Sequence, residues 1–149
     1  MLNVLVWFIA VEAIGLAVLP ICYYLLPTIK DRGYSVSKPL GILIIGYLSW
    51  ILSVLHVLPS VQITVAALVG AVGALAWWRI WSKRQELLDF WVHQRTSILI
   101  AEGVFLGIFL IWVIYHAYDP AINHTEQPMD FAFLNASVRS DVGSPEDPW

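Results

Sequence analysis

The stretch that decides the fold is ILIAEGVFLGIFLIWVIYHAY, residues 98–118. It is as long as the roughly 20 predominantly apolar residues that a helix needs to cross the hydrocarbon core of a bilayer. It contains one acidic residue, Glu102, and it is followed by Asp119-Pro120, which ends a helix because proline has no amide hydrogen to donate. The stretch therefore predicts a transmembrane helix.

Three further apolar stretches have similar length, at residues 2–26, 40–58 and 63–81. None of them alternates between apolar and polar residues as the strands of a membrane barrel do. Over the whole chain, 59% of the 149 residues are hydrophobic and 13% are charged, against about a quarter charged in a soluble domain. The sequence thus predicts an all-α polytopic membrane protein, with a four-helix transmembrane domain at residues 1–118 and a polar tail at 119–149.

The basic residues predict the orientation of these helices. Seven of the eight lysines and arginines fall in the two connections after the first and third stretches: Lys30, Arg32 and Lys38, then Arg79, Lys83, Arg84 and Arg95. Because positively charged loops stay on the cytoplasmic side, we expect both termini to lie outside. The expected location is the bacterial inner (cytoplasmic) membrane, with the tail extracytoplasmic.

Aromatic and basic residues cluster at the end of the third stretch and predict a membrane anchor. Its members are Trp77, Trp78, Trp81, Arg79, Lys83 and Arg84. Residues 82–97 follow, and they mix charges with the apolar residues Leu87, Leu88, Trp91 and Val92. This mixture predicts an amphipathic helix that lies in the cytoplasmic interface.

Small residues recur at four-residue spacing in the third and fourth stretches. They are Ala66, Gly70 and Ala74, and then Gly103 and Gly107. This spacing brings the backbones of two membrane helices close together. It fits a docking face for another protein and packing within the four helices equally well.

Ionisable residues inside the predicted spans are candidates for function, because burying a charge in hydrocarbon is costly. Glu12 and Glu102 fit either a proton relay or protonated carboxyl groups bonded to neighbouring helices. His56 and His116 lie near the outer ends of two spans, which allows a bis-histidine haem or two ordinary interfacial residues. The remaining histidines and Cys22 show no metal-ligand spacing, so we expect no metal and no cofactor.

The tail carries six of the eleven carboxylates. Asp130 precedes Phe131, Leu134 and Val138, which share one face of a short interfacial helix, and this order predicts that Asp130 is its N-cap. Alternatively, Glu126 and Asp130 are outward-facing acids that bind a metal ion or act as a general base.

The tail also carries a family resemblance. The strings HTEQPMDFAFLNASVRS, residues 124–140, and PEDPW, residues 145–149, resemble the outer-loop signature of the bacterial "YYY" membrane proteins. That uncharacterised polytopic family is similar in layout to the GT-C glycosyltransferases, which use lipid-linked sugars. The resemblance implies that Glu126 and Asp130 are the matching acids. It also implies that this sequence is the N-terminal part of a longer protein.

Two functions follow as expectations. The first is a small accessory or structural subunit that packs against larger subunits of a membrane complex, such as a respiratory or photosynthetic one, without chemistry of its own. The second is the N-terminal module of a GT-C-like glycosyltransferase that acts at the outer face. The expected partners are other integral-membrane subunits and the lipid bilayer. We expect no nucleic acid, because the net charge is −3 and no basic stripe is present.

Overall fold

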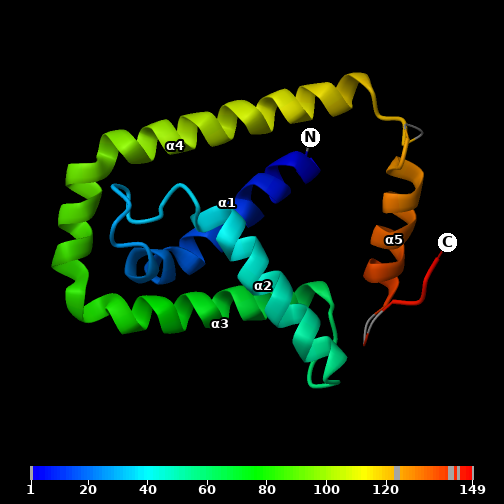
Figure 1. Cartoon of the computed structure of the whole chain (residues 1–149), viewed down its shortest axis with the longest axis horizontal. Helices are drawn as coiled ribbons and strands as arrows, with labels where there is room; N and C mark the ends of the chain where they lie inside the picture. Colours follow the sequence, from blue (N-terminus) through cyan, green and yellow to red (C-terminus); the bar gives the residue numbers. More distant parts are fainter. Residues whose placement is uncertain (1, 123–124, 141–142, 144, 149) are drawn as a thin grey trace.

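The computed structural model describes residues 2–122, 125–140, 143 and 145–148, and this part of the chain contains helices and no strand. Figure 1 shows the arrangement. The elements are α1 (Leu2–Leu25), α2 (Ser37–Val54), α3 (Gln62–Ile80), the 3-10 turn η1 (Trp81–Lys83), α4 (Arg84–Tyr118) and α5 (Gln127–Arg139). The predicted all-helical class is therefore confirmed.

Three helical stretches are long and apolar enough to cross a membrane: Leu2–Leu25, Ser37–Val54 and the unbroken run Gln62–Tyr118. The third stretch has 57 residues, far more than one crossing of a core about 30 Å thick requires at 1.5 Å per residue. Figure 1 shows that this run doubles back: α3 and most of α4 point in opposite directions on either side of α1. Between them, η1 and the beginning of α4 run across one end of the molecule.

Helix α1 packs against both α2 and α3, and small residues make these contacts close. A Cβ atom placed on Gly41 of α2 would lie 2.7 Å from Cγ2 of Ile14, and one on Gly73 of α3 would lie 3.1 Å from Cβ of Ala17. In a membrane, where helices gain little from burying apolar surface, such close backbone approach stabilises their packing.

The buried core lies at the end of the molecule where the chain passes from α3 to α4. Its members come from α1, the loop after it, α3 and α4: Leu19, Tyr23, Tyr34, Ile80, Leu87, Phe90 and Ile98. The loop at residues 26–36 folds inward, and only 8% of Asp31 is exposed. The Asp31 carboxylate accepts hydrogen bonds from the amides of Gly33 (3.1 Å) and Ser35 (2.9 Å). Burial alone would raise the pKa of Asp31, but hydrogen bonding by the Ser35 side chain, together with these two amide bonds, outweighs burial and lowers it.

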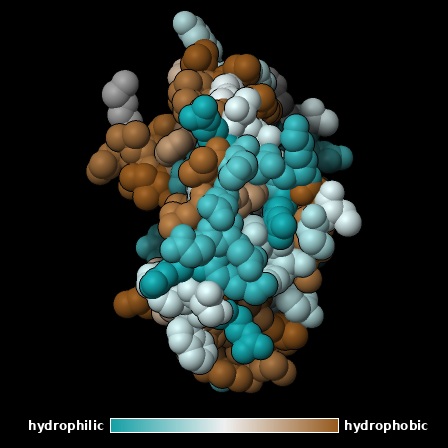
Figure 2. Space-filling model, turned by 90° about the vertical axis from the view of Figure 1, so that its left-hand side faces the viewer, coloured by the Kyte–Doolittle hydropathy of each residue, from teal (hydrophilic) through white to brown (hydrophobic). Residues whose placement is uncertain are grey.

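The connection at residues 82–97 is amphipathic, as predicted, but its buried face differs from the expected one. Leu87 and Phe90 are buried, whereas Leu88 and Val92 are exposed. The charged residues of this segment point outward. Figure 2, which views this end of the molecule, shows hydrophilic side chains gathered along the middle of the face with apolar surface beyond them.

The prediction that Asp130 caps the tail helix is wrong. Helix α5 begins at Gln127, with Pro128 in its first turn, and the amide of Asp130 already donates to the carbonyl of Glu126 at 3.0 Å. The reason is that proline is well suited to the first turn, where no amide hydrogen is needed. Asp130 is then a first-turn acid that interacts favourably with the helix dipole, and Phe131, Leu134 and Val138 are exposed as the apolar side chains of α5.

Candidate functional site

Lys38 of α2 contacts both acids that the sequence places inside predicted spans. Its Nζ atom lies 3.2 Å from Oε1 of Glu12 on α1, and it forms a hydrogen-bonded ion pair with Oε1 of Glu102 on α4. The sequence alone separates these acids by ninety residues and counts Lys38 among the loop cations. The structure instead brings the three residues together as a cluster, which we call the ion cluster (Glu12, Lys38 and Glu102).

Neighbouring residues shape the ion cluster. Gly15 makes room for the lysine, because a Cβ atom there would lie 2.7 Å from Cγ of Lys38. The Tyr34 hydroxyl donates to Oε1 of Glu102 at 2.7 Å. Burial, together with this hydrogen bond to a carboxylate, raises the pKa of Tyr34, which keeps the phenol protonated as a donor. The lysine Nζ also lies 4.3 Å from the centroid of the Phe105 ring, a cation–π distance.

The ion cluster lies beside the middle of α1 and α4, where the loop at residues 26–36 brings the first turn of α2 against them. Glu12 and Gly15 are central residues of α1. Slightly farther along the same helix, Ala17 packs against Gly73, a central residue of α3. Only 11% of the Lys38 side chain is exposed. Lys38 therefore lies in the apolar interior of the packed helices, where an unpaired ammonium group would be costly.

A cavity of about 240 Å³ adjoins the ion cluster. Tyr34, Lys38 and Glu102 contribute polar atoms to its wall, and Val11, Ile42 and Phe105 contribute apolar ones. The cavity has polar groups on its wall and is large enough to hold several water molecules, each of which occupies about 30 Å³ in the liquid.

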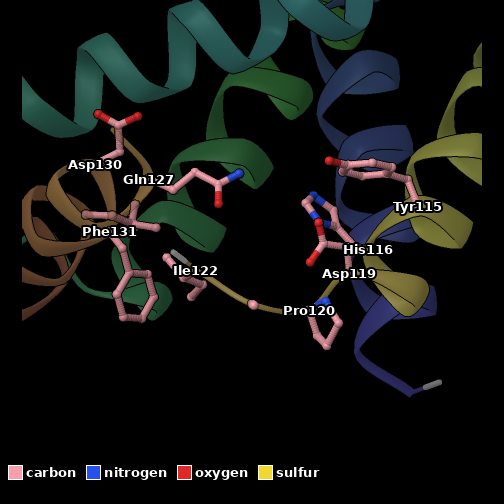
Figure 3. Close-up of a pocket in the computed structure, with 10 residues that line it drawn as sticks. Tyr115, His116, Asp119, Pro120, Ile122, Gln127, Asp130 and Phe131 are labelled. Carbon is pink, nitrogen blue, oxygen red and sulfur yellow. The ribbon is translucent and has the colours of Figure 1, made fainter. Parts of the chain in front are cut away.

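The acids of the tail are placed differently. Asp130 lines a hollow of about 450 Å³ between the end of α4 and the beginning of α5, together with His116 and Asp119. Figure 3 shows Gln127 of α5 extended toward His116, while the carboxylate of Asp130 points away from that histidine. Glu126 is exposed just before α5 and does not line the hollow. Within the described residues, no group of three histidine, cysteine or acidic side chains is placed to hold a metal ion.

The two histidines considered as haem ligands lie apart. His56 follows α2, and its Nδ1 atom is 2.9 Å from the carbonyl oxygen of Val54. His116, near the end of α4, packs against the rings of Trp112 and Tyr115. Figure 1 shows the ends of α2 and α4 at opposite edges of the molecule, so the fold does not bring these rings to one centre.

The small residues at four-residue spacing face away from the other described helices. Ala66, Gly70 and Ala74 are exposed on α3, and Gly103 and Gly107 are exposed on α4. A Cβ atom on Gly70, Gly103 or Gly107 would meet no described atom within 4 Å. Packing within the chain is carried instead by Gly15, Gly41 and Gly73.

The predicted anchor divides into two parts. Trp77 is directed at α1, where its Nε1 donates to the carbonyl oxygen of Leu16 at 2.9 Å. Its other members are exposed: Trp78, Arg79, Trp81, Lys83 and Arg84. Lys83 also lies 3.6 Å from the Glu86 carboxylate within the same connection. These exposed side chains lie at the end of the molecule that carries the hydrophilic face.

The long apolar helices are features of an integral membrane protein. Residues 44–149 match the family model described as "Uncharacterized membrane protein (DUF2298)". The chain belongs to this family, which confirms the predicted membership of an uncharacterised membrane protein family. The match includes Glu102 and Asp130, whereas Glu12 and Lys38 precede it. Neither the curated proteins nor the solved structures include a match to this chain.

Proposed function

We propose that the chain is an assembly module of the bacterial cytoplasmic membrane, in which four helical segments cross the bilayer and an open helix face binds the transmembrane helices of larger subunits. The crossings are α1, α2, α3 and the part of α4 that follows the connection at residues 82–97. The single observation that carries the proposal is that the small residues of α3 and α4 are exposed, although they have the spacing of packing faces.

The doubling back of Gln62–Tyr118 supports the count of four crossings. The hydrophilic face in Figure 2 supports an interfacial position for the connection between α3 and α4. The basic residues of this end favour the cytoplasmic side, although Lys38 belongs to the ion cluster and no longer counts among them. In this orientation both termini and α5 are extracytoplasmic.

The burial of the helices supports the docking role. In the apolar window of the run Gln62–Tyr118, 6% of the residues are buried within the chain, against 28% for α1. Gly103 and Gly107 lie on this uncovered surface, and their spacing permits a second helix backbone to approach closely. A partner helix would thus find on α4 the same kind of surface that α1 finds on α2.

Co-purification tests the proposal. A tagged full-length chain is isolated in mild detergent from the cells that naturally produce it, as the wild type and as the double variant Gly103→Leu/Gly107→Leu. We expect the wild type to carry further membrane subunits and the double variant to lose them. The matched control is Gly46→Leu on α2, where a Cβ atom also meets nothing within 4 Å but no small residue stands four positions away. A wild-type chain that migrates as a lone monomer would contradict the proposal.

A second candidate function is a module of a glycosyltransferase that uses a lipid-linked sugar. It is favoured by Asp130, which lines a hollow beside His116 and Asp119 in the segment that the family model covers. Its test is sugar transfer from a lipid-linked donor in membranes that contain the complete native protein. This function predicts that Asp130→Asn abolishes transfer, while Glu126→Gln, outside the hollow, preserves most of it. Equal activity of both variants would exclude Asp130 as the catalytic acid.

A further inference from the structure

The charges of the ion cluster do not balance when all three groups are ionised. Glu12 and Glu102 supply two negative charges and Lys38 supplies one positive charge. A net charge of −1 among apolar helices is costly, because few groups around it can solvate a charge. One additional proton makes the cluster neutral.

The two carboxyl groups have different surroundings. Oε1 of Glu102 accepts hydrogen bonds from both the Tyr34 hydroxyl and the Lys38 ammonium group, and such donors stabilise the ionised form. Oε1 of Glu12 is buried and, despite lying 3.2 Å from Lys38, has no hydrogen bond. Both Oε1 atoms contact the same Nζ atom, so the Glu102 carboxylate is an acceptor close to a proton on Glu12.

We propose that the ion cluster is a binding site for one exchangeable proton, which is carried by Glu12 and held within the membrane by Lys38 and Glu102. This inference goes beyond the docking function and does not depend on it. The three residues of the site come from α1, α2 and α4. A change in the charge of the site therefore changes the contact that holds α4 to the other helices.

The cavity of about 240 Å³ is lined by Lys38 and Glu102 but not by Glu12, so exchange with it passes through Glu102. On release, the O–H bond of Glu12 breaks, its electron pair stays on that carboxylate, and the proton forms an O–H bond with Glu102, which lines the cavity. The O–H bond of Glu102 then breaks in turn, and the proton forms a new O–H bond with water in the cavity. The ion cluster then changes from neutral to a charge of −1, with no oxidation or reduction. Uptake is the reverse step.

The elements packed around the site carry other ionisable side chains. Tyr34 is the titratable side chain that the loop directs at Glu102. Elsewhere in this loop, Asp31 is bound by backbone amides, and the guanidinium of Arg32 lies 4.5 Å from the Tyr23 ring centroid. From the described part of α3, the charged residue is Arg79, which is exposed near the other end of the helix from Gln62.

Infrared spectroscopy of the full-length chain in micelles of an alkyl maltoside, a detergent without carbonyl groups, tests the proposal. A protonated carboxyl group has its own carbonyl stretching band, to which an ionised carboxylate does not contribute. We expect the wild type to show the band of one protonated carboxyl group. Glu12→Gln and Glu102→Gln each leave one acid opposite one lysine, so both variants should lose the band.

Lys38→Gln provides the opposite result, because it leaves two acids with no ammonium group and should double the band. The matched control is Glu86→Gln, an exposed acid on the hydrophilic connection, which should leave the band unchanged. Helical circular dichroism checks that each variant is folded, and the wild-type band tests the proposal even where a variant fails to fold. Three results would overturn the proposal. The wild type could lack the band at neutral pH, or Glu12→Gln could retain it. The wild-type band could also disappear when sodium ions are added at constant pH.

Discussion

Helices α1 and α4 are both apolar enough to cross a membrane, but the chain covers them very differently. In the apolar window of α1, 28% of the residues are buried, against 6% for the run that ends with α4. Helix α1 is surrounded by the chain, whereas α4 lies along one edge of it in Figure 1. The difference shows that hydropathy identifies a span but does not determine what the span contacts.

The two helices are also held by different kinds of contact. Backbone approach at Gly15, Gly41 and Gly73 fixes α1 against its neighbours. Helix α4 is held by side chains, through the ion cluster and through the ring of Phe8, whose centroid lies 5.8 Å from that of Phe105. Variants at these two kinds of contact therefore separate the roles of the two helices.

The largest effect is expected where α1 and α2 approach closely. Gly41→Leu places a side chain where Ile14 already lies, against its backbone as well as its side chain, so we expect a loss at the upper end of the about 1–3 kcal/mol that overpacking costs. The free energy of unfolding in detergent measures this loss. Gly46→Leu is the control on the same helix and should change it little. Equal losses from both variants would show that the close approach is not what fixes α1.

The next effect concerns the attachment of α4. Tyr34→Phe removes the hydrogen bond from the phenol to the Glu102 carboxylate, and bonds to charged groups contribute about 1.5–3 kcal/mol. We expect a loss of about 2 kcal/mol in the free energy of unfolding. Tyr118→Phe, at a tyrosine that is 88% exposed, should cause no measurable loss. A stable Tyr34→Phe variant would show that α4 is held by other contacts.

The loop that folds into the core predicts a dependence of stability on pH. Because the pKa of Asp31 is lowered in the folded state, its contribution is present above its unfolded pKa of about 4 and is lost as pH falls through the folded value. Asp31→Asn should therefore lower the melting temperature at neutral pH and reduce its decrease at acidic pH. Asp89→Asn, at an exposed acid, serves as the control. Parallel pH profiles for Asp31→Asn and the wild type would contradict the assignment.

The smallest effect is expected between α3 and α1. Trp77→Phe removes the hydrogen bond from the indole to the Leu16 carbonyl, which is worth about 1 kcal/mol. The adjacent variant Trp78→Phe alters a side chain that is 75% exposed and should leave unfolding of the chain unchanged. If Trp78→Phe were the more destabilising of the two, the division of the anchor described above would be wrong.

The sequence predicts the helices well because their signal is local. The apolar length of residues 98–118 and the terminating Asp119-Pro120 place the end of α4 at Tyr118, where the structure has it. The start of α5 could not be placed correctly from Asp130 alone, because Pro128 favours an earlier beginning. Asp130 as an N-cap and Pro128 in a first turn are competing local signals, and the prediction followed Asp130.

The ion cluster could not be predicted, because it joins residues that are far apart in the chain. A lysine next to a predicted span normally serves as a loop cation, and only the fold of residues 26–36 carries Lys38 inward. One signal was nevertheless present: two acids inside spans require a nearby cation, and Lys38 is the basic residue closest to the start of a span. Whether Gly103 faces α1 or an outside partner depends on packing, which its spacing does not determine.

The central claim, that α4 presents an open face to another protein, is tested most directly by photo-cross-linking in native membranes. A photoreactive amino acid replaces Gly107 in the full-length chain, and in a second variant it replaces Gly46 on α2. We predict a discrete cross-linked product with another polypeptide from position 107 and none from position 46. Lipid adducts alone from position 107, in the same pattern as from position 46, would contradict the claim.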